Sequence, residues 1–128
     1  MTRTDNSLGK FSISLAVKSL EASRIFYQKL GFEVVGGDGQ RWQVLKNGEA
    51  TVGLVQGMFE RNILTFTPGW DDQREGVSSF TDVRALHARA KAAGLEPSEE
   101  TGLDRSTGPG SFMLTDPDGN PVLIDQHV

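Results

Sequence analysis

The chain repeats one helical plan at a constant distance. One predicted helix begins after Ser19, a residue type that caps helix N-termini, and ends at Gly31, the type that most often terminates helices. A second predicted helix begins after Asp82 and ends at Gly94, so both of its boundary residues lie 63 positions beyond those of the first. A fixed offset of this kind indicates a duplicated supersecondary unit. We therefore expect two copies of one small fold.

Each predicted helix carries apolar side chains at helical spacing. In the first helix, 20–30, the side chains expected to face the core are Ala22, Ile25, Phe26 and Leu30. In the second helix, 83–93, they are Val83, Leu86 and Ala90. The second helix is rich in small residues and is expected to pack closely.

Strand-like segments bounded by glycine-rich turns surround each helix. The strands predicted around the first helix are 11–17, 32–35, 41–45 and 51–55. Those predicted around the second helix are 75–81, 95–100, 111–115 and 121–127. Alternation in the first strand places Phe11, Ile13, Leu15 and Val17 toward the helices, and Ser12 and Ser14 on the other face of the sheet. The segment 63–67 has no counterpart in the repeat, and we interpret it as an extra extended piece that joins the halves.

These elements predict one domain of the α+β class. A chain of 128 residues is long enough for a real core and short for two independent domains. We expect a single domain over 1–128, with a first module at about 8–57, a linking segment at 58–73 and a second module at about 74–128.

Composition excludes several classes of function. The chain has 0 cysteines, so it has neither disulfides nor thiolate chemistry. Its net charge of -4 argues against nucleic-acid partners, which favour basic surfaces. It has neither an apolar stretch that could cross a membrane nor a secretion signal, and we expect a cytoplasmic protein with no membrane partner.

Several stretches of the sequence together point to one family. They are Val17-Lys18-Ser19-Leu20, Phe26-Tyr27-Gln28-Lys29-Leu30-Gly31-Phe32, Asp82-Val83, Lys91-Ala92-Ala93-Gly94 and Asp116-Pro117-Asp118-Gly119-Asn120. With the strands between them, they resemble the vicinal oxygen chelate superfamily, which includes glyoxalase I, extradiol dioxygenases, fosfomycin-resistance enzymes and bleomycin-binding proteins. The resemblance implies two βαβββ modules that form a concave, half-barrel sheet of the glyoxalase-like type. It also implies a ligand in the bowl of that sheet and a homodimer.

Metal-dependent members of that family hold a divalent cation with His or Glu on inward positions of their strands. The resemblance places Ser12, Gly53 and Leu123 at three such positions, and the 63-residue offset carries position 12 to Glu75. A hydroxyl, a missing side chain and an aliphatic group are poor ligands for a divalent cation. The expected state is therefore a bowl without a metal and a protein without a cofactor.

The two histidines leave one alternative open. His87 lies on the second helix, where a surface or packing role is expected. His127 shares a strand face with Leu123 and Asp125 by alternation, although it can equally be a frayed C-terminal residue. A relocated divalent-metal site would use Glu75, Asp125 and His127.

The floor of the predicted bowl consists of small, weakly polar side chains, which suits an organic ligand that is aromatic or cationic. The residues predicted to contact this ligand are Ser12, Ser14, Trp42, Gly53, Phe66, Trp70, Phe112, Leu123 and Asp125. For each aromatic residue in this set, plain core packing is the alternative.

Three functions remain open from the sequence. The leading hypothesis is a metal-independent protein that binds or sequesters a small molecule. The second is a lyase, isomerase or dioxygenase-like enzyme with the relocated metal site, in which Glu75 is the best candidate for a general base. The third is an interaction module whose bowl is filled by its own side chains.

Overall fold

The computed structural model describes residues 7–70 and 79–128. Its elements, in chain order, are β1 (Lys10–Val17), α1 (Leu20–Lys29), β2 (Glu33–Gly37), β3 (Trp42–Asn47), β4 (Ala50–Gln56), β5 (Ile63–Thr67), α2 (Val83–Ala92), β6 (Ser98–Thr101), β7 (Gly110–Thr115) and β8 (Pro121–Gln126). Two compact units contain them. We call residues 12–64 the first module, and residues 65–128 with the N-terminal segment up to Phe11 the second module. Each has the order βαβββ, which confirms the predicted α+β class.

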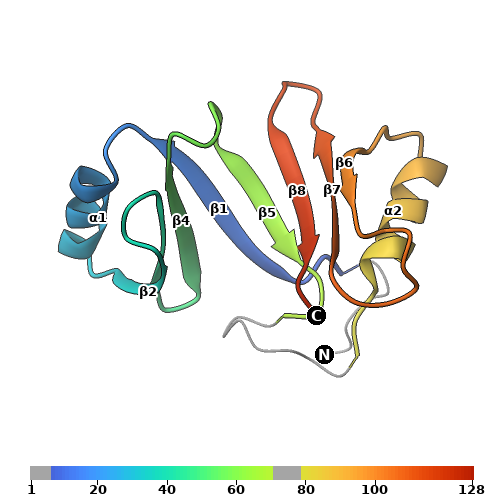
Figure 1. Ribbon diagram of the computed structural model, residues 1–128, viewed down its shortest axis with the longest axis horizontal. Coiled ribbons are helices and arrows are strands. Elements are labelled where there is room, and N and C mark those ends of the chain that lie inside the picture. The colour runs from blue at the N-terminus through green and yellow to red at the C-terminus, as the bar shows by residue number, and fades with distance from the viewer. Residues whose placement is uncertain (1–6, 71–78) are drawn as a thin grey trace. The chain divides into compact units, whose positions relative to one another are not determined.

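The sheet of the first module has the strand order β2-β3-β4-β1. Its neighbours are antiparallel except for β4 and β1, which run parallel. α1 packs against β3 and β4, and the blue helix can be followed beside β4 in Figure 1. The buried core side chains are Leu20, Leu45, Val52 and Leu54.

The inward face of α1 is not the one that its apolar spacing predicted. Ile25, Phe26 and Leu30 are 40%, 57% and 61% exposed, and Ala22 is also exposed. Tyr27 packs against the core instead, with its ring 5.5 Å from that of Phe32. The helix is therefore anchored by Leu20 and the Tyr27 ring, and the predicted stripe of apolar side chains lies at the surface.

The sheet of the second module has the order β5-β8-β7-β6. α2 packs against β7 and β8, and the yellow-orange helix lies beside these strands in Figure 1. The core consists of Val83, Leu86, Phe112 and Ile124, with Ala90 packed against it. The face predicted for α2 is therefore confirmed. Both helices have ten residues, and no helix in the described ranges is long and apolar enough to cross a membrane.

The first strand of the second module comes earlier in the chain than the repeat predicted. Residues 75–78 of the expected strand 75–81 lie outside the described residues, and 79–82 have no regular secondary structure. β5 instead lies beside β8. Part of the segment interpreted as a link, 58–73, is therefore a strand of the second module. The 63-residue offset holds for the two helices and fails on both sides of them. Before them, 68–82 is a longer connection than the one between β1 and α1, and after them β8 ends 70 positions beyond the end of β4.

A glutamine at the end of each module's last strand closes that module on its helix. The Oε1 atom of Gln56 accepts the backbone N–H of Leu20 at 2.7 Å, and that of Gln126 accepts the backbone N–H of Val83 at 2.8 Å. The first amide groups of a helix have no partner within the helix. The two glutamines provide that partner from the strand, and they show that the duplication extends to single hydrogen bonds.

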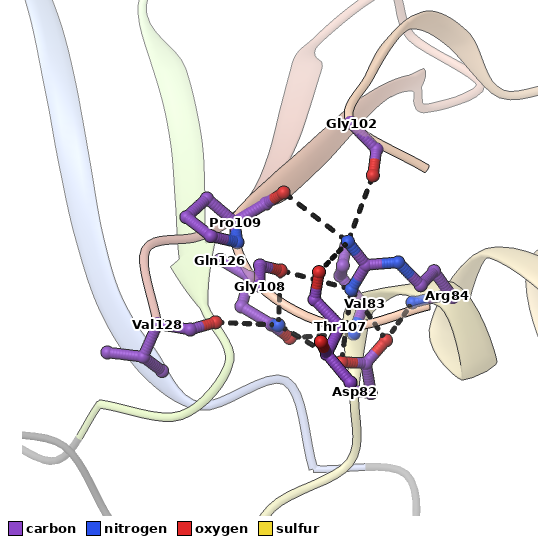
Figure 2. A network of polar contacts seen from close by, with 9 residues as sticks. All are labelled: Asp82, Val83, Arg84, Gly102, Thr107, Gly108, Pro109, Gln126 and Val128. Carbon is purple, nitrogen blue, oxygen red and sulfur yellow. Dashed lines mark hydrogen bonds and ion pairs between the residues drawn. The ribbon is translucent and has the colours of Figure 1, made fainter. Parts of the chain in front are cut away.

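In the second module this contact belongs to a larger polar network around Arg84 (Figure 2). The guanidinium donates to both carboxylate oxygens of Asp82 at 3.1 and 3.2 Å. It also donates to four backbone carbonyls in the loop between β6 and β7, at 2.9 to 3.4 Å: Gly102, Thr107, Gly108 and Pro109. Gln126 Nε2 donates to Asp82, to the Gly108 carbonyl and to the Val128 carbonyl. One side chain thus joins the start of α2 to the loop of eight residues, 102–109, between β6 and β7.

Asp82 makes the stability of this network depend on pH. Partial burial works to raise the pKa of its carboxyl, but hydrogen bonds from the Arg84 backbone, the Gln126 side chain and the Arg84 side chain, with the Arg84 charge, hold that pKa below the ordinary 3.8. The unfolded chain then binds the proton more readily than the folded protein. This contribution to stability is therefore present above pH 3.8 and is lost as the pH falls through the lowered pKa.

We expect the thermal unfolding midpoint to fall as the pH is lowered through and below 3.8, and the Asp82→Asn variant to show a shallower fall. Asp116 contributes in the same direction, because hydrogen bonds from the Asn120 side chain and backbone lower the pKa of its carboxyl. Calorimetry of the two proteins across this range measures the difference. Equal slopes for wild type and variant would contradict the role given to Asp82.

Candidate functional site

Each module has one sheet face that its helix does not cover, which we call its open face. In the first module Ile13, Leu15 and Val17 pack against the helix-side core, so the alternate residues of β1 lie on the open face. Ser12 and Ser14 are therefore where the sequence predicted them. The register pairs Ser14 with Gly53 of β4, and Val44 of β3 with the same glycine.

Gly53 leaves the centre of this open face without a side chain. A Cβ atom built on it would lie 3.4 Å from the Ser14 hydroxyl oxygen, at van der Waals contact, so glycine leaves this space to its neighbours. Trp42, two residues before Val44 on β3, shares the face and is 41% exposed. Four predicted ligand contacts, Ser12, Ser14, Trp42 and Gly53, are thus brought together on one surface of small hydroxyls and one exposed indole.

The open face of the second module carries Leu123 and Asp125. Val122 and Ile124 belong to the helix-side core, which places these two alternate residues of β8 on the other side. The aspartate Oδ2 lies 3.1 Å from His127 Nε2. The imidazole stacks on Trp70, with ring centroids 4.6 Å apart and an interplanar angle of 15°. His127 therefore contacts both a carboxylate and an indole, and it is not a frayed C-terminal residue.

Two predicted ligand contacts lie on the helix side instead. Phe112 is 1% exposed in the core of the second module, and Phe66 packs against the same core, 5.2 Å from Phe11. Both are structural aromatic residues, the alternative that the sequence left open for each. His87 has the packing role expected of it: its Nε2 atom is hydrogen-bonded to the Glu100 carboxylate, and its ring lies edge-on 5.2 Å from Phe112.

The residues at the family's metal positions do not fit a divalent cation. Ser12, Gly53 and Leu123 offer at most one neutral oxygen, whereas such cations bind through imidazole nitrogens and carboxylate oxygens. Within residues 7–70 and 79–128, no three or more His, Asp or Glu side chains are grouped so that they could hold a metal ion. Glu75, the weak candidate for a ligand and a general base, lies outside the described residues.

Sequence reasoning missed a pocket on the helix side of the second module. It has a volume of about 270 Å³. Its lining residues are Leu8, Leu86, Arg89, Ala90, Leu95, Phe112, Leu114, Val122 and Ile124. The 63-residue offset contained a signal for it, since Ala90 and Leu95 stand where the first module has Tyr27 and Phe32.

Comparison with known proteins agrees with this fold. The sequence profile of the Glyoxalase/Bleomycin resistance protein/Dioxygenase superfamily matches residues 11–124. No curated protein matches the chain. Among solved structures, a member of the same superfamily from Vibrio splendidus 12B01 has a TM-score of 0.62 and 19% identity, covering 91% of this chain and 97% of that one.

Two further structures show the range of proteins that share the fold. Methylmalonyl-CoA epimerase from Mycobacterium tuberculosis has a TM-score of 0.68 and 16% identity, with 100% of this chain and 93% of that chain covered. The Mn(II)-bound glyoxalase from Novosphingobium aromaticivorans has a TM-score of 0.59 and 25% identity, with 91% and 38% covered. The match over 11–124 spans most of the sequence. The chain therefore belongs to the glyoxalase, bleomycin resistance protein and dioxygenase superfamily.

Proposed function

We propose that this protein binds and sequesters a small organic molecule on the open faces of its sheets, without using a metal ion. The observation that carries the proposal is the replacement of the family's ligands by Ser12, Gly53 and Leu123 on those faces. The hydroxyls and the bare glycine on the open face of the first module, and Leu123 on that of the second, supply no ligand for a divalent cation, and each face leaves room for an organic ring. The superfamily itself includes bleomycin resistance proteins beside its enzymes.

The exposed indole of Trp42 supports an aromatic or cationic ligand. It is 41% exposed on the same sheet face as Gly53, so a planar molecule can stack on it without displacing core side chains. In the second module, Trp70 already stacks on His127, and Asp125 adds negative charge beside that pair. Binding of this kind requires shape and stacking but no catalytic group.

Elemental analysis and thermal unfolding test the absence of a metal. We expect native protein to contain well under one divalent ion per chain. A metal that binds only the folded state would raise the unfolding midpoint, and its removal would lower it. We therefore expect the midpoint to change by less than about 1 °C in EDTA or in added Ni²⁺, Zn²⁺ or Mn²⁺. One tightly bound metal ion per chain would contradict the proposal.

The enzyme alternative keeps one observation in its favour, the 3.1 Å contact between Asp125 and His127. A carboxylate that holds an imidazole is a common arrangement around metal ligands. If a metal is found, the variants Asp125→Ala, His127→Ala and Glu75→Ala should each abolish its binding, with Trp42→Phe as the control that retains it. Retention of the metal by all three alanine variants would remove this alternative.

A further inference from the structure

The two modules fill the space between helix and sheet differently. In the first module the rings of Tyr27 and Phe32 meet edge to face at 79° and pack against the buried core. In the second module Ala90 packs against the corresponding core, and Leu95 is 52% exposed. The pocket of about 270 Å³ lies between α2 and its sheet, where the second module lacks such rings.

Backbone hydrogen bonds establish that these positions correspond. The N–H of Phe32 donates to the Tyr27 carbonyl at 3.0 Å, and the N–H of Leu95 donates to the Ala90 carbonyl at 2.9 Å. The glycines that end the helices repeat this match, because Gly31 N–H donates to the Gln28 carbonyl and Gly94 N–H to the Lys91 carbonyl, both at 3.0 Å. The two helix ends therefore share these two hydrogen bonds. At the matched positions the side chains differ in size, with Tyr27 and Phe32 in the first module and Ala90 and Leu95 in the second.

The walls of the pocket decide what it can hold. Leu86, Phe112 and Ile124 are 5%, 1% and 2% exposed and make an apolar floor. A cavity of about 150 Å³ with this kind of lining stays dry and binds benzene. A pocket of about 270 Å³ therefore has room for one aromatic ring or two fused rings.

Arg89 adds a preference for charge. It is the charged side chain among the described residues that line the pocket, and it lies on the exposed side of α2. A guanidinium has five N–H donors in a planar fork, so it can bind a carboxylate in addition to other partners. An aromatic ring on the apolar floor with a carboxylate directed to Arg89 satisfies both parts of the lining.

We propose that the helix-side pocket of the second module is a binding site for an aromatic carboxylate of one or two rings, which occupies the space that Tyr27 and Phe32 fill in the first module. This site is separate from the open faces and lies wholly within the second module. Its ligand is anionic, whereas the open faces favour an aromatic or cationic one.

The test uses 2-naphthoate as the probe with the full-length protein, by titration calorimetry. We expect one site per chain with a sub-millimolar Kd. The variant Ala90→Tyr with Leu95→Phe transfers the first module's own rings into the pocket. It should weaken 2-naphthoate binding at least about tenfold and raise the unfolding midpoint, since the lining regains contacts. Should this double variant not fold, Leu95→Phe alone, at a half-exposed position, provides the same comparison.

Two further measurements distinguish binding in this pocket from binding on the open faces or at the general surface. Arg89→Gln should weaken 2-naphthoate about tenfold and leave naphthalene binding unchanged, because only the first carries a carboxylate. Trp42→Ala, on the open face of the first module, should leave 2-naphthoate binding unchanged. Three results would each overturn the proposal: no 2-naphthoate binding to folded wild type, equal binding by the Ala90→Tyr, Leu95→Phe variant, or loss of binding in Trp42→Ala. None of these results depends on whether the protein holds a metal.

Discussion

Replacing Phe112 by alanine is expected to lower the free energy of unfolding by about 3 to 5 kcal/mol. The ring is 1% exposed and belongs to the core cluster that Val83, Leu86 and Ile124 form. Its loss removes apolar contacts and leaves a cavity that extends the existing pocket, which the phenylalanine also lines. Because small domains are stable by only about 5 to 15 kcal/mol, a fraction of the chain should already be unfolded at moderate temperature.

Trp42→Ala is the matched control for this change. Both residues belong to the aromatic set predicted to contact a ligand, but Trp42 is 41% exposed on the open face of the first module. We expect it to change stability by less than about 1 kcal/mol. Urea unfolding of both variants, with the slope compared to wild type, measures the two effects. Equal losses would mean that Phe112 is not the structural residue described above.

Replacing Arg84 by methionine is the second large expected effect. The side chain is 16% exposed and serves Asp82 and four loop carbonyls. Methionine keeps much of the aliphatic stem and removes every donor, so the Asp82 carboxylate loses its ion pair and the carbonyls lose their shared partner. We expect a loss of about 3 kcal/mol and a drop of about 10 °C in the unfolding midpoint.

Limited trypsin digestion provides a local measure of the same change. Arg105 lies within the loop whose carbonyls Arg84 binds, so cleavage after Arg105 reports how often that loop opens. Cleavage there should be much faster in Arg84→Met than in wild type. Lys91→Met, an exposed position on the same helix, is the control and should change neither stability nor cleavage beyond the loss of its own trypsin site. Unchanged digestion at Arg105 in Arg84→Met would contradict the anchoring role.

The parts of the fold that the sequence predicted are those fixed by local chemistry. Ser19 and Asp82 accept backbone N–H groups of the first turn at 3.2 and 2.8 Å, and Gly31 and Gly94 have the positive φ values, 104° and 89°, that favour glycine. The same holds for the β7–β8 turn, where Asp116 Oδ1 accepts the N–H groups of Asp118 and Asn120. Short-range hydrogen bonds of this kind can be predicted from the residue types that make them.

The wrong predictions concern choices that only packing makes. In α1, either of two faces could pack against the sheet: the one with Ile25, Phe26 and Leu30, or the one with Tyr27. The Tyr27 face packs there, where its ring contacts that of Phe32. The first strand of the second module was placed by extending the helix offset backward, but β5 lies before a connection of different length. Helical spacing contains no information about which neighbour lies opposite, and a repeat need not preserve the length of its loops.

The candidate site was predictable to the level of faces. Strand alternation placed Ser12, Ser14 and Gly53 on one face, and Leu123 with Asp125 on another. It could not separate Trp42, on an open face, from Phe112 in the core, because that distinction depends on the register between strands. The stacking of Trp70 on His127 likewise joins segments that are distant in the chain.

The glutamines at the ends of β4 and β8 also affect how each module opens. Amide hydrogens in the first turn of a helix usually exchange quickly with solvent, since they have no partner within the helix. Here the amides of Leu20 and Val83 are bound to the far end of their own module, at Gln56 and Gln126. Fraying at the start of either helix therefore requires the glutamine at the end of the same module's last strand to release its hydrogen bond. The first turn of each helix and the end of that strand then open together, as one cooperative unit.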